Sequence, residues 1–432
     1  MRRLVYSLFA LTLLLAISHA ESGSTDFIVT LRNAKSIAGV NEAAGTKTVR
    51  SVKNAPVFLV RSDTSDGAKA LKKLQKHPDV KSVEPDVRIR LTSANSQPSW
   101  LRSSYSDLLD GGSRTTFFGT DVLRAYAEQP ALDVTGVSAV RSLSTGIAAR
   151  VAYIDTGVDR DHPALRAWLD PGVDLVRGSD VSELDGLGSS YSDLLDHSYS
   201  DLLDKRLFFF LNSNAGAGSG LPAAFGHGTM VAGLIHAVAP QSVIIPIKAF
   251  DAYGDTTMFR IIEGVYQAIQ LNADVLNMSF STEEQSDALL QAIDAARAAG
   301  VAVVAAVGNE SKEFSNRYPA SYNGVYGVAA TDLNDKLANF SNYGRDVSLT
   351  APGVGVISTA PGGRYAAAWG TSFSSPIVAG SIALMVTGRS HNQSYAAAVL
   401  NTSQDIDGKN PGFERKLGKG RINLRNAFKA KD

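Results

Sequence analysis

Short apolar segments that alternate with stretches of helical periodicity constrain the fold of this chain more than any other feature. The apolar segments have the composition of buried strands and lie at 149–155, 242–248, 274–278 and 301–307. Apolar residues recur at helical spacing between them, after 227, through 261–269 and after 283. Apolar strands joined by helices predict a parallel sheet covered on both faces, a doubly wound α/β fold. Such sheets carry their chemistry at the carboxyl ends of the strands.

Residues 27–91 follow a different pattern. It predicts a small α+β unit, built from strands at 27–31 and 57–61, a helix that starts near Asp66 and a last strand within 83–91. Residues 21–91 hold 13 Lys and Arg against 8 Asp and Glu, a net charge of +5, whereas residues 92–432 have a net charge of −7. The two parts should therefore attract each other.

Composition and the first residues limit the class of protein. The chain has 432 residues and no cysteine, which excludes disulfides, thiolate catalysis and cysteine-ligated metals. No basic stripe with interleaved aromatic residues occurs, so nucleic acid is not an expected partner. Residues 1–20, MRRLVYSLFALTLLLAISHA, have the pattern of a secretory signal peptide. A membrane anchor is the alternative, but the apolar run is shorter than the roughly 20 residues that span a bilayer. We therefore expect secretion, to the extracellular space or the periplasm, and no membrane association after signal removal.

The heptapeptide SYSDLLD occurs three times, at 104–110, 190–196 and 198–204. The first copy lies in 92–140, a stretch of weak pattern that we interpret as a junction with only local structure. The other two lie in an insert at about 170–224, within a main domain of 141–432. Chains tolerate insertions at such places, so a neutral duplicated insertion is the favoured interpretation. The alternatives are a calcium site built from the repeated carboxylates and a self-cleavage sequence at the junction.

Three motifs place an acid, a base and a hydroxyl at strand ends and helix starts. Asp155 ends a strand in IDTGVDRDHP, His227 starts a helix in FGHGTMVAGL, and Ser372 starts another in WGTSFSSPIVAG. A serine hydroxyl is a weak nucleophile until an imidazole accepts its proton, and the imidazole needs a carboxylate to fix its tautomer. Asn309 follows the strand at 301–307, where its amide can donate to the oxyanion that the attack creates.

Each of these residues also has an ordinary structural interpretation, because Asp and Asn form turns after strands and Ser caps helices. Their order along the chain, Asp-His-Ser, favours catalysis. It differs from the Ser-Asp-His order of α/β-hydrolases, whose GxSxG motif is absent around Ser372, so an esterase or lipase is disfavoured. A catalytically silent binding protein on the same fold is the second hypothesis.

The motifs together resemble those of the subtilisin family of serine endopeptidases, over roughly 149–169 and 225–427. The matching motifs are D-T-G-V-D, H-G-T-x-V-A-G, N-M-S, G-N-E and G-T-S-x-S-x-P. The resemblance implies these roles: orientation of the base for Asp155, general base for His227, nucleophile for Ser372 and oxyanion hole for Asn309. Residues 21–91 resemble the family's inhibitory propeptide, most clearly in HPDVKSVEPDVRIRL. That likeness implies a ferredoxin-like fold and an autoprocessed zymogen.

The same resemblance implies that protein or peptide substrates bind as an extended strand, so recognition should depend mainly on their backbone. The residues expected to bind them are the stretch after Lys248, together with Ser279, Phe280, Ser281 and Gly308. The resemblance also places Arg317 near the floor of the primary specificity pocket, where relatives often have a small residue. We expect its head group to reach solvent; the alternative is that it favours an acidic residue before the scissile bond.

Two features that bind calcium in many relatives are absent. Alanine stands at 164, where relatives often have Asp, and residues 236–240 lead into the next strand without a polar loop. Hard cations need several oxygen ligands, so the usual calcium site is lost, and a structural calcium ion elsewhere is the alternative. We expect no metal ligands and no cofactor required for catalysis, in a monomer inhibited by its own propeptide.

Overall fold

The structure of the protein is a computed structural model that describes residues 25–62, 67–91, 112–178, 181–183, 222, 224–386 and 392–430. The expected signal peptide and all three SYSDLLD copies lie outside these residues. The chain forms two compact units. The N-terminal unit contains the residues up to Arg88 together with Thr257–Tyr266 and Ser286–Ala292, and the remaining residues form the main unit.

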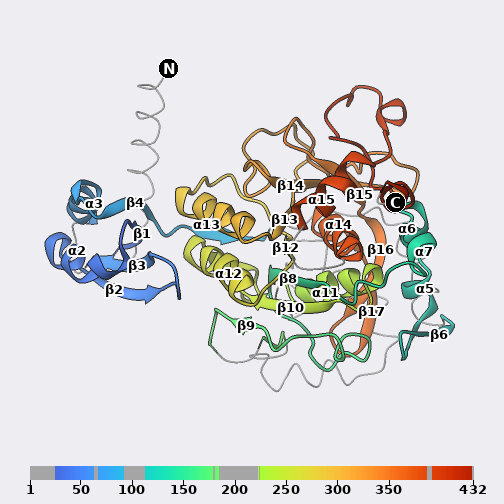
Figure 1. Cartoon of the computed structure of the whole chain (residues 1–432), viewed down its shortest axis with the longest axis horizontal. Coiled ribbons are helices and arrows are strands. Elements are labelled where there is room, and N and C mark those ends of the chain that lie inside the picture. The colour runs from blue at the N-terminus through green and yellow to red at the C-terminus, as the bar shows by residue number, and fades with distance from the viewer. Residues whose placement is uncertain are drawn as a thin grey trace. The chain divides into compact units, whose positions relative to one another are not determined.

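One sheet of seven strands organises the main unit, and all neighbouring strands in it run parallel (Figure 1). In spatial order they are β15 (Leu349–Pro352), β14 (Val325–Thr331), β13 (Ala302–Ala306), β12 (Val275–Met278), β8 (Arg150–Asp155), β10 (Val243–Lys248) and β9 (Val173–Asp174). The central strands β12 and β13 are buried at every residue, as expected for a parallel sheet covered on both faces. The predicted doubly wound α/β fold is confirmed.

Parallel register brings the carboxyl ends of the central strands together. Asp155, the last residue of β8, pairs with Lys248, the last residue of β10, and Ile154 pairs with Met278 at the end of β12. The three strands therefore stop at the same edge of the sheet. The segments that follow them start from this edge, which is where chemistry is expected in such folds.

Helices α11 (His227–Val238) and α14 (Thr371–Met385) pack against the sheet and against each other. Gly380 permits their close approach, because a Cβ atom there would lie 2.8 Å from the Cβ atom of Val238. Nearly every residue of both helices is buried, so they are apolar all round instead of amphipathic. They form the centre of the main unit's core.

Helices α12 (Met258–Gln270) and α13 (Asp287–Ala298) lie close to where their periodicity predicts them. The pattern predicts the second helix from Glu283, but α13 begins four residues later. Ser286 Oγ accepts a hydrogen bond from the backbone N–H of Leu289 at 2.9 Å, so Ser286 caps the helix and fixes its start.

Residues 112–140 form five short elements: β6 (Arg114–Phe117), β7 (Thr120–Leu123), α5 (Arg124–Ala127), α6 (Pro130–Val134) and α7 (Val137–Val140). Their side chains join the core of the main unit, where Val122, Tyr126 and Leu132 are fully buried. The sequence predicts a junction with only local structure here, whereas these residues pack into the main core. The weak pattern arises because each element is too short for a helical or strand period to repeat.

The rest of the main unit completes the core with a hairpin and three C-terminal elements. They are β16 (Val354–Ala360), β17 (Arg364–Trp369), α15 (Asn392–Asn401), the 3₁₀ turn Asp407–Lys409 and α16 (Leu424–Lys429). In the described part of the chain, no helix has both the length and the apolar character needed to cross a membrane.

The N-terminal unit is an antiparallel sheet with two helices. Its elements are β1 (Asp26–Leu31), α2 (Ile37–Ala44), β2 (Thr46–Ser51), β3 (Val57–Ser62), α3 (Gly67–Lys76) and β4 (Val80–Pro85). The strand order β2-β3-β1-β4 is that of a ferredoxin-like fold. Phe27, Val60 and Leu74 are fully buried in its core. The predicted α+β unit is present, with α2 and β2 in addition to the predicted elements. A further short strand, β5 (Arg88–Arg90), follows it.

Candidate active site

Asp155 is held at the end of β8 by the backbone around it. Its side chain is buried, and Oδ1 accepts a hydrogen bond from the N–H of Thr156 at 2.8 Å. Its carbonyl oxygen accepts from the N–H groups of Ala249 and Phe250, at 3.0 and 3.1 Å. The carboxylate therefore has a fixed direction at the strand end.

His227 begins α11 and faces this carboxylate. Its Nδ1 lies 2.7 Å from Asp155 Oδ1, and its side chain is 14% exposed. Burial alone would lower the pKa of His227, but the charge of Asp155 and the hydrogen bond to it outweigh burial, and Glu183 acts in the same direction. The net effect raises the pKa above 6.5, so the imidazole is basic and its charged form is supported.

Ser372 is the second residue of α14, two residues after Gly370, which precedes the helix at the N-cap position. Its carbonyl oxygen accepts a hydrogen bond from Ser279 Oγ at 2.8 Å. The ring of the next residue, Phe373, lies 5.3 Å from the ring of His227, centroid to centroid. The start of α14 thus lies beside the imidazole, and the positive end of the helix favours negative charge there.

Asn309 follows β13 and is fixed by the residue before Ser372. Its Oδ1 accepts hydrogen bonds from Thr371 N at 2.9 Å and Thr371 Oγ1 at 3.0 Å. Because the oxygen of the amide is used in this way, Nδ2 is the donor end. Nδ2 lies 3.6 Å from the position that a Cβ atom would take on Gly370, so it points to the start of α14.

The segment that follows β12 supports the site mainly through its side chains. Ser279, Phe280 and Ser281 are all buried; Ser279 holds the carbonyl of Ser372, and Phe280 packs its ring 5.2 Å from Phe250. Gly308 has a φ of 99° and no room for a side chain, because a Cβ atom would lie 2.6 Å from Ser281 Oγ.

The expectation that Arg317 exposes its head group to solvent is wrong. Its side chain is 9% exposed, and the guanidinium lies 2.9 Å from a carboxylate oxygen of Glu283 and 3.4 Å from one of Glu310. Neither partner was predicted. Glu310 directly follows Asn309 in the G-N-E motif, whereas Glu283 comes from another segment and carries no sequence signal.

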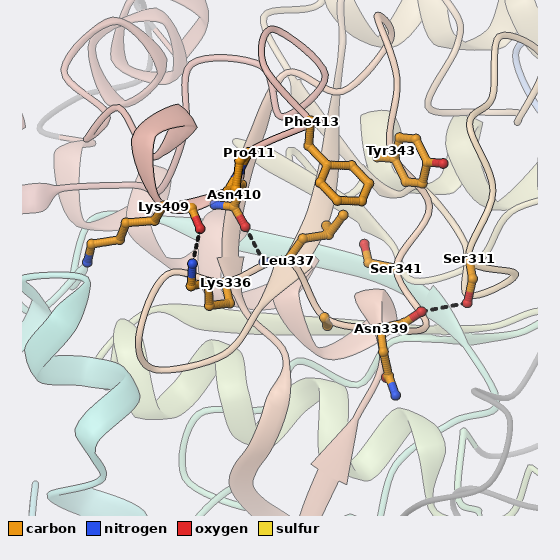
Figure 2. A pocket seen from close by; sticks show the side chains of 11 residues that line it. Ser311, Lys336, Leu337, Asn339, Ser341, Tyr343, Lys409, Asn410, Pro411 and Phe413 are labelled. Atoms are coloured by element: carbon orange, nitrogen blue, oxygen red, sulfur yellow. Dashed lines mark hydrogen bonds between the residues drawn. The ribbon is translucent and has the colours of Figure 1, made fainter.

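A cavity of about 360 Å³ is lined by both polar and apolar residues (Figure 2). Its lining includes Ser311, Lys336, Tyr343, Lys409 and Phe413. Lys336 Nζ donates to the carbonyl of Lys409, and Ser311 Oγ donates to the carbonyl of Asn339. The cavity contains none of the predicted catalytic residues.

The described part of the chain contains no recognisable metal site. Among those residues, no group of three or more His, Asp or Glu side chains is arranged to hold an ion. Ala164, at the position of the usual calcium ligand, is 1% exposed and belongs to the apolar core. A site formed by the repeats would lie outside the described residues.

An acid, an imidazole and a serine near the carboxyl edge of a parallel sheet, with an asparagine amide fixed beside the serine, define the class of serine hydrolases with Asp-His-Ser order. Residues 146–420 match the subtilase family. This chain therefore belongs to the subtilase family of serine endopeptidases.

The chain is also similar in sequence to several serine proteinases and subtilisins. The thermophilic serine proteinase of Bacillus sp. (strain AK1) is 35% identical over 278 residues, which are 64% of this chain and 61% of the relative. Subtilisin DY of Bacillus licheniformis is 38% identical over 46% of this chain and 76% of its own length. Subtilisin NAT of Bacillus subtilis subsp. natto is 31% identical over 83% of this chain and 78% of its own length. The chain thus spans less than two thirds of the first relative and about three quarters of the two subtilisins.

The fold is also that of a known crystal structure. A lanthipeptide protease superposes with a TM-score of 0.58 at 21% sequence identity, over 74% of this chain and 99% of that chain. At this identity, the likeness concerns the fold alone.

Proposed function

We propose that this protein is a secreted endopeptidase that hydrolyses peptide bonds of protein substrates through Asp155, His227 and Ser372. The observation that carries the proposal is the 2.7 Å contact between His227 Nδ1 and Asp155 Oδ1, made where α11 packs against α14. With Nδ1 directed to the carboxylate, Nε2 is the nitrogen that accepts the serine proton.

The reaction follows from these placements. Ser372 Oγ attacks the carbonyl carbon of the scissile bond while His227 Nε2 takes the hydroxyl proton. The negative charge that develops on the carbonyl oxygen is stabilised by Asn309 Nδ2 and the backbone N–H of Ser372. The C–N bond then breaks as His227 returns the proton to the leaving amine, and the acyl group stays on Ser372. Water, deprotonated by His227, hydrolyses this ester and restores the serine.

Substrates are proposed to bind as an extended strand beside the stretch that follows Lys248. The chain itself supplies an example of such pairing within the main unit. The backbone N–H of Leu91 donates to the carbonyl of Gly254 at 2.9 Å, and Arg90 forms an ion pair with Asp255 at 2.5 Å. Backbone pairing of this kind tolerates many side chains, so cleavage specificity should be broad.

The N-terminal unit is proposed to be an inhibitory propeptide that is removed by self-cleavage. Residues 89–91, which follow this unit in the chain and belong to the main unit, pair with the stretch where a substrate strand is proposed to bind, which supports inhibition by occupancy. Apolar side chains from 117–140 are part of the main core, so this stretch is proposed to stay with the mature enzyme. We therefore place the cut within 92–111, a range that includes the first SYSDLLD copy.

No step of this mechanism uses a cofactor or a metal ion. Secretion is proposed from the signal-peptide pattern of residues 1–20, and the active form is proposed to be a monomer whose partners are its substrates and its own propeptide.

The test is intact-mass and peptide mapping of the purified protein beside its Ser372→Ala form, each incubated with a denatured protein substrate. We expect the wild type to lose its N-terminal unit at a site within 92–111 and to cut the substrate, while the variant stays full length. If both proteins stay intact and inert, the proposal is wrong, and a catalytically silent binding protein is the better interpretation.

A further inference from the structure

Glu183 lies in the insert between Asp155 and His227 and was assigned no role by any motif. Residues 181–183 run as a short extended segment beside the catalytic strand end. Val158 N donates to Val181 O at 3.0 Å, and Glu183 N donates to Val158 O at 3.1 Å. Gly157 permits this approach, since a Cβ atom there would lie 2.3 Å from the carbonyl oxygen of Val181. The insert is thus anchored directly behind the D-T-G motif.

The carboxylate of Glu183 gathers donors from both catalytic motifs. It accepts hydrogen bonds from the hydroxyls of Thr156 and Thr229, and from the backbone N–H groups of Gly228 at 3.1 Å and Thr229 at 3.2 Å. The side chain is 3% exposed. Thr156 directly follows Asp155, and Gly228 and Thr229 directly follow His227. One buried carboxylate therefore joins the two segments that carry the acid and the base.

Helix α11 needs this acceptor because it lacks a cap of its own. The residue before the helix is Gly226, in the left-handed region with a φ of 87°, and it has no side chain to bind the first free N–H groups. Glu183 binds two of these groups from a distant segment. It also places a negative charge at the positive end of the helix, where anions are stabilised.

The groups around His227 carry negative charge on one side and no charge on the other. Two carboxylates, Asp155 and Glu183, face the start of α11, and from α14 the imidazole meets the ring of Phe373. Around Glu183 itself lie the hydroxyl of Tyr153, which donates to Gly157 O, and Lys248, whose Nζ donates to Ser182 O at 2.5 Å. Burial raises the pKa of Glu183, while the hydrogen bonds from the two threonines oppose that shift.

We propose that Glu183 is a positioning residue for peptide-bond hydrolysis: it fixes the start of α11 against the Asp155 turn and supports the positively charged form of His227. The inference rests on the proposed function of the triad. Through Glu183, the insert takes part in positioning the catalytic residues, a role that is independent of the SYSDLLD copies.

The experiment compares Glu183→Gln, Glu183→Ala and the exposed control Glu128→Gln with the wild type. Two quantities are measured for each: the pH profile of kcat/KM on a peptide substrate, and the midpoint of His227 titration by NMR in the Ser372→Ala background. For Glu183→Gln we expect kcat to fall about tenfold with KM unchanged, and both midpoints to move down by about one pH unit. The control should match the wild type.

The outcomes separate this inference from the proposed function. A wild type that is active, with a Glu183→Gln variant whose kcat and midpoints equal those of the wild type, overturns the positioning role alone. A variant that loses only thermal stability, with both midpoints unchanged, also overturns it, because a structural residue behaves in that way. An inert wild type overturns the proposed function, and the NMR midpoint still decides the effect of Glu183 on His227. If Glu183→Ala does not fold, Glu183→Gln carries the test.

Discussion

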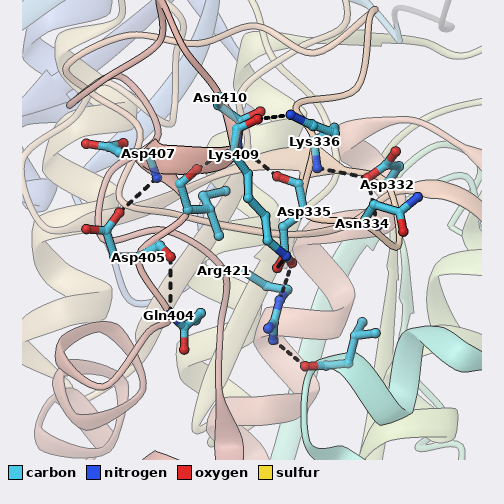
Figure 3. A network of polar contacts seen from close by, with 12 residues as sticks. Asp332, Asn334, Asp335, Lys336, Gln404, Asp405, Asp407, Lys409, Asn410 and Arg421 are labelled. Carbon is cyan, nitrogen blue, oxygen red and sulfur yellow. Dashed lines mark hydrogen bonds and ion pairs between the residues drawn. The ribbon is translucent and has the colours of Figure 1, made fainter.

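Two buried aspartates of the main unit, Asp335 and Asp155, differ in the groups that face them. Asp335 accepts a contact from Arg421 Nε and an ion pair from Lys409 Nζ at 2.8 Å, as Figure 3 shows. Asp155 faces an imidazole and backbone donors. A permanent cation neutralises Asp335, whereas the charge near Asp155 changes when His227 gains or loses a proton. The first arrangement holds the fold, and the second can drive chemistry.

The Asp335 cluster shows what a structural ion network contributes. Arg421 also donates to the carbonyls of Val134 and Ile422, so it ties the C-terminal segment to the stretch at 112–140. The two carboxylate oxygens of Asp335 each face a cation, Arg421 at Oδ1 and Lys409 at Oδ2. Two permanent positive charges favour the ionised carboxylate and disfavour proton uptake by it, whereas an imidazole can gain and lose a proton near neutral pH.

The largest effect is expected at the aspartate that faces the imidazole. Asp155→Asn keeps the size of the side chain but removes the charge that fixes the His227 tautomer, so kcat should fall about 10⁴-fold. The melting temperature should change little, because no permanent cation is left unpaired. Initial rates on a peptide substrate, together with thermal unfolding, test both parts. A variant that keeps more than a tenth of the activity would contradict the assignment of Asp155.

Asn309→Ala removes the donor that Thr371 orients beside Ser372. Loss of one oxyanion donor typically lowers kcat by about 10² to 10³-fold, with little change in KM. Steady-state kinetics on a peptide substrate measures the two constants separately. The matched control is Asn334→Ala in an exposed turn, which should leave both unchanged. An equal rise in KM would instead assign Asn309 to substrate binding.

Asp335→Asn should reverse this pattern. It leaves the guanidinium of Arg421, which is only 11% exposed, without its buried carboxylate partner, and breaking a pair of this kind typically costs about 3 kcal/mol or more of unfolding free energy. Urea unfolding in the Ser372→Ala background measures the loss. Glu313→Gln, which breaks the exposed pair with Lys416, should cost less than about 1 kcal/mol. The comparison fails if Asp335→Asn lowers kcat per folded molecule.

Carboxylates of the N-terminal unit make a third case, in which burial dominates. Burial raises the pKa of Glu84 to about 7 and that of Asp86 to about 6, although hydrogen bonds oppose both shifts. Glu84 accepts hydrogen bonds from Ser286 Oγ and Asp287 N, and Asp86 accepts one from Phe259 N. A carboxyl group whose pKa is higher in the folded than in the unfolded chain stabilises the folded unit at pH values below its unfolded-state pKa. This contribution is lost as the pH rises through the folded-state pKa.

The N-terminal unit should therefore become less stable between about pH 4.5 and pH 7, by roughly 1 kcal/mol from Glu84 after allowance for its remaining solvent contact. Hydrogen exchange of the β1 and β3 amides in the Ser372→Ala form measures this slope. Glu84→Gln should flatten it, and Glu42→Gln, at an exposed position, should leave it intact. A slope of the opposite sign would mean that the helix-start N–H groups outweigh burial.

The sequence predicted the residues of the site that lie at the ends of regular elements. Asp155, His227 and Asn309 follow or begin segments whose periodicity is clear, so their side chains could be placed at one edge of the sheet. Glu183 could not be predicted, because it lies in an irregular insert and its four donors come from two other segments. The burial of Arg317 was missed for the same reason: its partner Glu283 lies in another loop. Contacts between irregular segments depend on tertiary structure and have no local period.

The smallest effect concerns Arg317, which is paired with carboxylates like the cations of the Asp335 cluster, and one of whose partners, Glu310, directly follows Asn309. Its charge is already compensated by Glu283 and Glu310, so a preference for acidic residues before the scissile bond should be weak. Glu310→Gln removes one compensating charge and should raise cleavage after Glu relative to Leu by about fivefold, roughly 1 kcal/mol. Arg317→Ala should abolish that gain in the double variant. Rates on a matched pair of Glu and Leu peptides decide the matter: an unchanged ratio in Glu310→Gln would place the guanidinium outside the pocket and make its ion pairs purely structural.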